Sequence, residues 1–137
     1  DEVAGLFLGI YGAYHFVTVI SCLVLARWWQ AVLYNPGGFK TEFHHLRLEP
    51  GFAILLAGFI LAALAGVPPL DSWLVIMSIA PLLSGLALMH YIVAYRKLGF
   101  NWLILAYLLA LFISPIVILL GLIDSVMNFR KRITGTN

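Results

Sequence analysis

The sequence predicts an all-α membrane protein, a polytopic transmembrane helix bundle with four membrane-inserted segments and one short interfacial amphipathic helix. Two observations lead to this prediction. Apolar residues make up 63% of the 137 residues and charged residues only 10%, whereas soluble domains contain about 25% charged residues. The apolar residues also form long runs without alternation of apolar and polar positions, and such runs favour spanning helices over barrel strands.

Four apolar runs of at least 20 residues contain no Lys, Arg, Asp or Glu. A helix needs about 20 residues to cross the hydrocarbon core of a bilayer. The expected membrane-inserted segments are residues 3–26, 51–67, 72–95 and 98–127, all within a single transmembrane domain over residues 1–137. Because the chain begins at Asp1 without Met, we expect it to be the C-terminal part of a longer protein.

The connection between the first two segments predicts a short amphipathic helix over residues 39–48. It follows the turn signal NPGG at residues 35–38. Three apolar residues, Phe39, Phe43 and Leu46, recur there at helical spacing, and most of the other positions are charged or polar. A helix of this kind lies in the plane of the membrane interface.

Lysine and arginine residues predict the orientation, because cytoplasmic connections carry an excess of both. The first connection has three, the third has two and the C-terminal tail has three, while the N-terminal flank and the second connection have none. Four simple crossings would leave the tail on the side opposite the other basic connections. Pro115 must kink or break the last segment. We predict a break at Ser114-Pro115, after which the chain either returns to the basic side, as the charge bias favours, or crosses.

Small residues recur at every fourth position in the first two segments. They are Gly5, Gly9 and Ala13 in the first segment, and Gly58, Ala62 and Gly66 in the second. Small faces let helix backbones approach closely and gain packing energy. We therefore expect both faces to lie in helix–helix contacts.

Polar residues are few inside the spans, and ionisable ones at that depth are candidates for function. The candidates for a polar site are Tyr11, Tyr14, His15, His90, Tyr91, Ser114 and Asp124. A proton relay or a substrate site would need several of them to converge. The simpler interpretation, which we favour, has each histidine neutral and donating one hydrogen bond to a neighbouring helix, and Asp124 facing Arg130 or water.

No motif in the sequence predicts catalysis, a cofactor or a metal site. One E-x-x-H, from Glu42 to His45, lies in the interfacial segment, whereas di-metal helix bundles use two such motifs and two further Glu residues. Cys22 is the single cysteine, which excludes an internal disulfide and a cysteine metal cluster. We expect a non-enzyme without metal or cofactor, whose basic residues flank spans and do not form a nucleic-acid-binding stripe.

Several segments of the chain resemble the YybS-like family of uncharacterised bacterial inner-membrane proteins. They are LARWWQA at residues 25–31, YNPGGF at 34–39, EFH at 42–44, LRL at 46–48, LIDS at 122–125 and NFRKR at 128–132. The resemblance covers nearly the whole chain and corresponds to the C-terminal half of a family member. It implies a multi-pass protein of the bacterial inner membrane, and a loose grouping with the substrate-binding membrane subunits of energy-coupling-factor transporters. It implies no functional residues.

Three functions remain open at this point. The first is a non-catalytic accessory or assembly subunit that packs against other membrane-protein subunits, which the small-residue faces and the scarcity of polar groups favour. The second is a substrate-binding membrane subunit of a transporter, which the resemblance implies. The third, a membrane-embedded enzyme, is the weakest because no nucleophile with a base can be named.

Overall fold

The computed structural model describes residues 2–135, and every regular element in that range is helical. In chain order the elements are α1 (Glu2–Tyr34), α2 (Gly38–His45), α3 (Pro50–Leu64), the 3₁₀ helix η1 (Leu70–Trp73), α4 (Leu74–Tyr95), α5 (Asn101–Phe112), α6 (Ser114–Met127) and α7 (Phe129–Thr134). The described residues contain no strand, so the prediction of an all-α chain is confirmed.

Two helical stretches, Val3–Tyr34 and Leu70–Tyr95, are long and apolar enough to cross a membrane. Two bent pairs of helices meet the same criterion only if each pair counts as one span: α2 with α3, bent by 59°, and α5 with α6, bent by 107°. These helices support the prediction of a membrane protein, but four separate spans are not confirmed. The physical reason is length, since α3 alone rises about 22 Å and a bilayer core is about 30 Å thick.

The second predicted segment ends earlier than residue 67 because of Gly66. This glycine has φ 75°, a left-handed conformation that ends helices. The N–H of Gly66 donates to the carbonyl of Ala63 at 3.0 Å, and the N–H of Val67 donates to that of Ala62 at 3.1 Å. The helix therefore stops at Leu64.

α2 is the predicted interfacial helix, but it ends at residue 45 and not at residue 48. Residues 46–49 leave the helical conformation and lead to Pro50 in the first turn of α3. Glu49 caps α3, because its carboxylate accepts a hydrogen bond from the N–H of Phe52 at 2.8 Å. This hydrogen bond lowers the pKa of Glu49.

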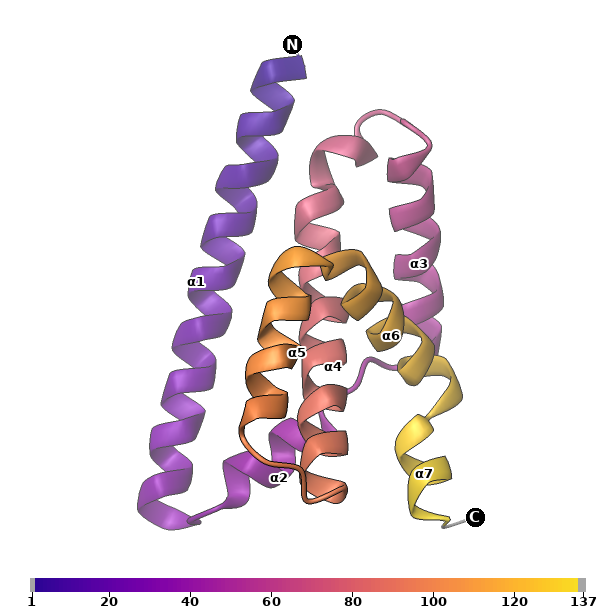
Figure 1. Cartoon of the computed structure of the whole chain (residues 1–137). Helices are drawn as coiled ribbons and strands as arrows, with labels where there is room; N and C mark the ends of the chain where they lie inside the picture. Colours follow the sequence, from indigo (N-terminus) through magenta and orange to yellow (C-terminus); the bar gives the residue numbers. More distant parts are fainter. Residues whose placement is uncertain (1, 136–137) are drawn as a thin grey trace.

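The last predicted segment breaks at the position that Pro115 indicated. α5 ends at Phe112 and α6 begins at Ser114, with Ile113 between them at φ −130° and ψ 44°. The bend of 107° is too sharp for one kinked helix. α6 and α7 then lead the chain back to the end of the bundle at which α5 begins (Figure 1). The predicted break is confirmed, and within the bundle the chain returns.

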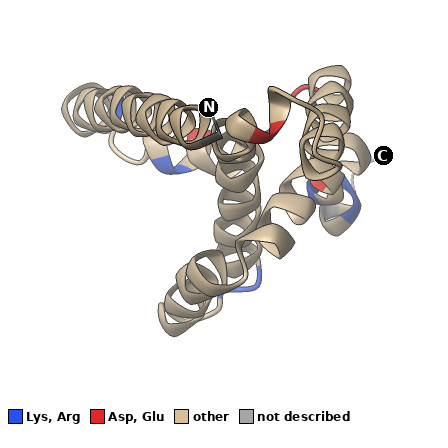
Figure 2. Ribbon diagram, turned by 90° about the horizontal axis from the view of Figure 1, so that it is seen from above, with Lys and Arg blue, Asp and Glu red and all other residues tan. Residues whose placement is uncertain are grey.

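Three arms of the bundle meet at α4, which packs against α1, α2, α3, α5 and α6. α1 slants away to one side, α5 stands on a second side, and α3 lies with α6 and α7 on a third (Figures 1 and 2). α2, the 96–100 turn and α7 lie toward the same end of the bundle, which we call the basic end. The eight Lys and Arg residues belong to segments at or near this end: Arg27, Lys40, Arg47, Arg96, Lys97, Arg130, Lys131 and Arg132.

α4 and α6 cross in close backbone contact at two glycines. A Cβ atom added at Gly121 would clash with the carbonyl oxygen of Pro81 and lie 2.7 Å from the backbone nitrogen of Gly85. Gly85 meets the backbone of α6 in the same way. The hydroxyls of Ser84 and Ser125 flank the crossing and lie 3.5 Å apart. Small residues thus allow the two helix backbones to touch.

The small-residue face of α1 packs against η1 and the start of α4. A Cβ atom at Gly9 would clash with the carbonyl oxygen of Ser72, and one at Gly5 would lie 2.7 Å from the Ser72 hydroxyl. Ala13 on the same face is buried. The structure therefore places Gly5, Gly9 and Ala13 together at a contact with η1 and α4.

The predicted face of α3 is oriented differently, and Gly58 makes no helix–helix contact within the described chain. Gly58 has open space around its Cβ position, Ala62 is half-buried, and Gly66 caps the helix. The buried residues of α3 are Ala53, Leu56 and Ala63. α3 packs against α6, η1 and α4, and it turns this face, two of whose three buried residues are alanines, toward them.

Gly121→Ala and Gly58→Ala form a matched pair that tests the crossing of α4 and α6. The methyl group at position 121 has to push the two backbones apart, and overpacking of this kind costs about 1–3 kcal/mol. The methyl group at position 58 meets no neighbour, and alanine is favoured over glycine inside a helix by roughly 0.5–1 kcal/mol. Unfolding in detergent, followed by circular dichroism, should show a loss of stability for Gly121→Ala and a small gain for Gly58→Ala. Equal stability of the two variants would contradict the contact.

Candidate functional site

A crevice of about 530 Å³ lies at the basic end between α1, α2, α4 and α5. Most of its wall is apolar. Its polar side chains are Lys40, His44, His90 and Tyr107. They come from α2, α4 and α5, so the crevice forms only because α5 runs back alongside α4. We call this space the histidine crevice.

His90 is fixed in the histidine crevice by contacts on both of its ring nitrogens. Nδ1 lies 2.9 Å from the carbonyl oxygen of Leu86, one turn earlier in α4, so Nδ1 carries the proton and donates. Nε2 is then the acceptor for the Tyr107 hydroxyl, at 3.4 Å. The rings of Phe43 and Tyr107 lie edge-on to His90, with centroids 5.2 and 5.5 Å away. The simpler interpretation expected donation to a neighbouring helix, whereas His90 donates within α4 and its contact with a neighbouring helix is the hydrogen bond that Nε2 accepts from Tyr107 of α5.

α2 presents two further histidines to α4. The rings of His44 and His45 lie edge-on to that of Tyr91, with centroids 6.4 and 6.3 Å away. Partial burial lowers the pKa of His44, and the nearby positive charge of Lys40 lowers it further. His44 is therefore neutral at pH 7, and Lys40 supplies the positive charge on the wall of the histidine crevice.

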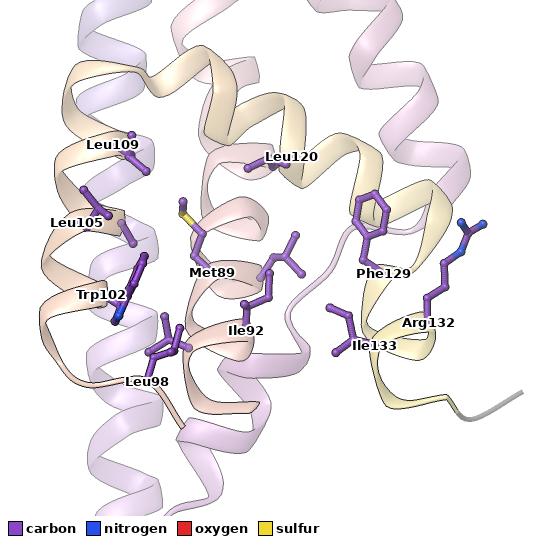
Figure 3. Close-up of a pocket in the computed structure, with 13 residues that line it drawn as sticks. Met89, Ile92, Leu98, Trp102, Leu105, Leu109, Leu120, Phe129, Arg132 and Ile133 are labelled. Carbon is purple, nitrogen blue, oxygen red and sulfur yellow. The ribbon is translucent and has the colours of Figure 1, made fainter. Parts of the chain in front are cut away.

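A second groove, lined almost entirely by apolar side chains, lies on another face of α5 between α4, α6 and α7 (Figure 3). It shares Val93 and Leu98 with the histidine crevice. The two spaces are otherwise lined by different side chains. α5 therefore separates a space with histidines from a space with hydrocarbon walls.

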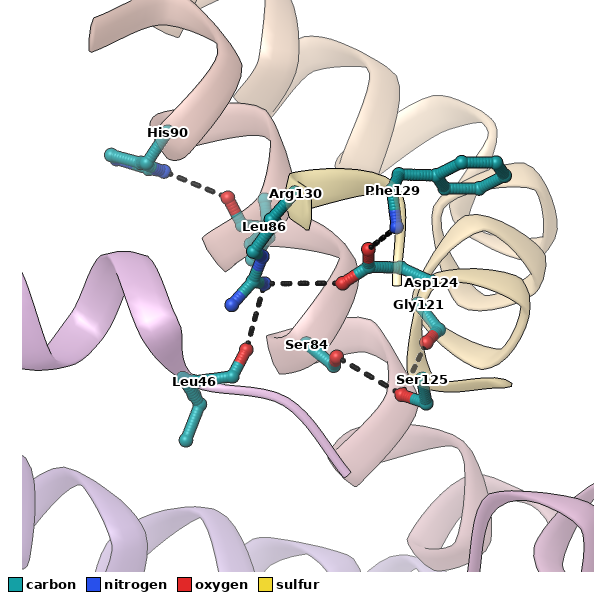
Figure 4. A network of polar contacts seen from close by, with 9 residues as sticks. All are labelled: Leu46, Ser84, Leu86, His90, Gly121, Asp124, Ser125, Phe129 and Arg130. Carbon is teal, nitrogen blue, oxygen red and sulfur yellow. Dashed lines mark hydrogen bonds and ion pairs between the residues drawn. The ribbon is translucent and has the colours of Figure 1, made fainter. Parts of the chain in front are cut away.

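Arg130 fastens the C-terminal part of the chain to the rest of the bundle (Figure 4). Its guanidinium donates a hydrogen bond to the carbonyl oxygen of Leu46 at 2.8 Å and lies 3.4 Å from the Asp124 carboxylate. The same group lies over the ring of Tyr91, 5.9 Å from its centroid. One side chain thus joins the connection after α2, the end of α6 and the face of α4. Burial lowers the pKa of Arg130, and the charge of Asp124 opposes that effect.

Asp124 is fully buried, and both of its carboxylate oxygens contact groups of the protein. One carboxylate oxygen accepts a hydrogen bond from the N–H of Phe129 at 3.0 Å, and the other faces Arg130. Asn128, between α6 and α7, adopts a left-handed conformation with φ 50° that lets the chain turn there. Asp124 therefore holds the turn that delivers Arg130 to Leu46.

The polar residues predicted on the first segment do not join those of α4. Tyr11, Tyr14 and His15 are exposed on α1. The rings of Tyr11 and Tyr14 lie 4.3 and 5.4 Å from that of His15. Within the described chain these three candidates do not converge with His90 and Tyr91, because α1 turns its small-residue face toward α4 and its polar face outward.

Ser114 is the first residue of α6 and is half-buried, which leaves it outside the histidine crevice. The crevice instead contains Lys40, His44 and Tyr107, which the sequence did not single out. Spacing along the chain could not find Tyr107, because it lies on a different helix from His90. The amphipathic pattern of α2 was the available signal for Lys40 and His44.

Comparisons with family models, curated proteins and solved structures give no significant match for this chain. The resemblance to the YybS-like family is therefore a prediction. Among the described residues no group of three or more His, Cys, Asp or Glu side chains could hold a metal ion. Glu42, the acid of the E-x-x-H, pairs with Arg27, whose Nε donates to it at 2.7 Å. The histidine crevice combines hydrogen-bonding side chains, aromatic rings and the positive charge of Lys40, a set of groups that can bind a small molecule.

Replacement of Asp124 alone should lower the free energy of unfolding much more than replacement of Asp124 and Arg130 together. Asp124→Leu leaves the buried Arg130 charge without its carboxylate, and loss of one member of a buried pair costs about 3–5 kcal/mol. The double variant Asp124→Leu with Arg130→Met removes both charges, and we expect it to be more stable than Asp124→Leu alone. Chemical unfolding in detergent measures both differences. Additive losses in the double variant would show that the pair is not coupled.

Proposed function

We propose that the chain is a non-catalytic subunit of a membrane complex, in which α1 packs against a second membrane protein. The observation that supports this proposal most strongly is a set of polar side chains on the outer surface of α1. We call this set the polar stripe; it consists of Tyr11, Tyr14, His15, Thr18, Ser21 and Cys22, all exposed.

The polar stripe points away from the rest of the chain. At 3.6 residues per turn, positions 11, 15, 18 and 22 share one face of a helix. Gly9 and Ala31, which are buried, lie on the opposite face. The stripe is therefore turned toward whatever surrounds the protein in the membrane.

The depth of His15 makes lipid an unfavourable neighbour for the stripe. Its position is about 20 Å along α1 from Glu2, which falls within a bilayer core if α1 spans. Ionisable side chains at that depth almost always face protein or a water-filled cavity, because hydrocarbon offers their polar atoms no hydrogen bond. A helix of a second membrane protein would supply that cover.

The location that best fits this role is the bacterial inner membrane, with the basic end in the cytoplasm. The excess of Lys and Arg at one end of the bundle supports this orientation. The resemblance to the YybS-like family supports the choice of membrane. Both remain parts of the proposal.

A substrate-binding subunit of a transporter is the second candidate, and the histidine crevice favours it. Small-molecule sites are concave, mostly apolar and equipped with a few convergent polar groups. The crevice has these properties, with Lys40 as a positive charge and His44 and His90 as hydrogen-bonding groups. In this alternative the partner of α1 would be the subunit that couples transport to nucleotide hydrolysis.

Photo-crosslinking in native membranes tests the proposal. A benzophenone amino acid at Tyr11 lies on the polar stripe, and the same amino acid at Leu23 lies on another face of α1. The two positions are matched because each residue is 64% exposed. We expect a discrete protein adduct from position 11 and none from position 23, since the stripe is the face that a partner covers.

Equal adducts from the two positions, or none from either, would contradict the packing role of α1. The adduct from position 11 also separates the two candidates when it is identified by mass spectrometry. A nucleotide-hydrolysing pair of subunits would favour transport. A larger membrane complex without such a pair would favour the accessory role.

A further inference from the structure

The groove between α4, α5, α6 and α7 is a space of about 520 Å³ that neither proposed function uses. Its wall is formed by apolar side chains of all four helices (Figure 3). Among the described residues that line it, Arg132 is the one charged side chain. We call this space the apolar groove. No described residue of α1, the helix that carries the polar stripe, lines the apolar groove. A ligand of the groove and a partner of α1 would therefore occupy different surfaces.

The apolar groove has a direction along the bundle. Leu109 and Leu120 lie near the corner where α5 turns into α6, Leu98 and Ile133 lie toward the basic end, and the Arg132 side chain lies at the outer edge of the groove, on α7 beside Phe129 (Figure 3). The distance along α5 from Trp102 to Leu109 is about 10 Å. The groove therefore has a hydrocarbon-lined interior, and its charged side chain lies at the edge that α7 forms.

The size of the apolar groove favours a single hydrocarbon chain over a helix as its occupant. A helix about 10 Å in diameter and about 10 Å long would need roughly 800 Å³, which exceeds the 520 Å³ of the groove. Cavities of about 300–1,000 Å³ are typical of small ligands. A flexible chain of methylene groups fits the available space and its apolar wall.

We propose that the apolar groove binds an acyl chain of an anionic phospholipid, whose phosphate lies at Arg132. The chain would lie against Leu105 and Leu109, with its end toward the α5–α6 corner, as in one leaflet of a bilayer. Arg132 is exposed at the mouth of the groove. A guanidinium is well suited to two hydrogen bonds with a phosphate.

Two further features of the groove agree with a lipid that carries net negative charge. Trp102 lines the groove at the start of α5, and tryptophan rings prefer the level of the headgroups. Clusters of Lys and Arg at the end of a bundle attract anionic lipids by about 1 kcal/mol per residue. Arg96, Lys97, Lys131 and Arg132 surround this end of the bundle.

Native mass spectrometry of the full chain tests the choice of headgroup. The purified protein is mixed with equal amounts of dioleoyl phosphatidylglycerol and dioleoyl phosphatidylcholine, which share their acyl chains. We expect phosphatidylglycerol adducts to dominate. Arg132→Gln should lower that preference about fivefold. Arg96→Gln removes a charge at the same end but outside the groove and should leave most of the preference intact.

A second pair of variants tests where the acyl chain lies. Leu105 and Leu108 are 45% and 46% exposed on the same helix, but Leu105 lines the apolar groove and Leu108 does not. Leu105→Trp fills the groove and should reduce the binding of both lipids several-fold, whereas Leu108→Trp should not. Equal binding of the two headgroups by the unmodified chain, or equal effects within either pair of variants, would overturn the proposal.

Discussion

Gly85 and Gly121 allow the backbones of α4 and α6 to touch, and the other helices are arranged around this contact. α6 can reach α4 only because the chain bends by 107° after α5. α5 then occupies a different side of α4 from α6, and the apolar groove opens between them. α3 packs against both α6 and α4. Without side chains at the two glycines, the crossing is held by close backbone packing, which in lipid replaces the hydrophobic effect as the force between helices.

The crossing also determines where the end of the chain lies. α6 leads Asp124 to the turn before α7, and that turn directs Arg130 to the carbonyl of Leu46 and the ring of Tyr91. The buried polar groups of the described bundle thus hold segments together. Accessible polar groups include those on the outer face of α1 and those in the histidine crevice. The first set is the basis of the proposed assembly role, and the second is the basis of the alternative, a binding site.

Much of the helical architecture could be predicted from the sequence, because continuous apolar runs have one solution in lipid. Pro115 indicated the break, and the three basic residues of the C-terminal tail favoured a return of the chain to the side of the other basic connections. The partners of the small residues could not be predicted. Gly121 and Ser125 have the same four-residue spacing as Gly5 and Gly9, and spacing does not reveal which face of a helix meets another. The histidine crevice was not predicted for the same reason, since its polar side chains come from three different helices.

Disulfide formation between positions 84 and 125 tests the crossing of α4 and α6 most directly. The hydroxyls of Ser84 and Ser125 are 3.5 Å apart, so cysteines at these positions are close enough to bond after small rotations of their side chains. In a chain with Cys22→Ser, Ser84→Cys and Ser125→Cys, mild oxidation should produce an internal disulfide rapidly and in nearly every molecule. The contact is contradicted if both cysteines remain free to react with a maleimide after oxidation and unfolding.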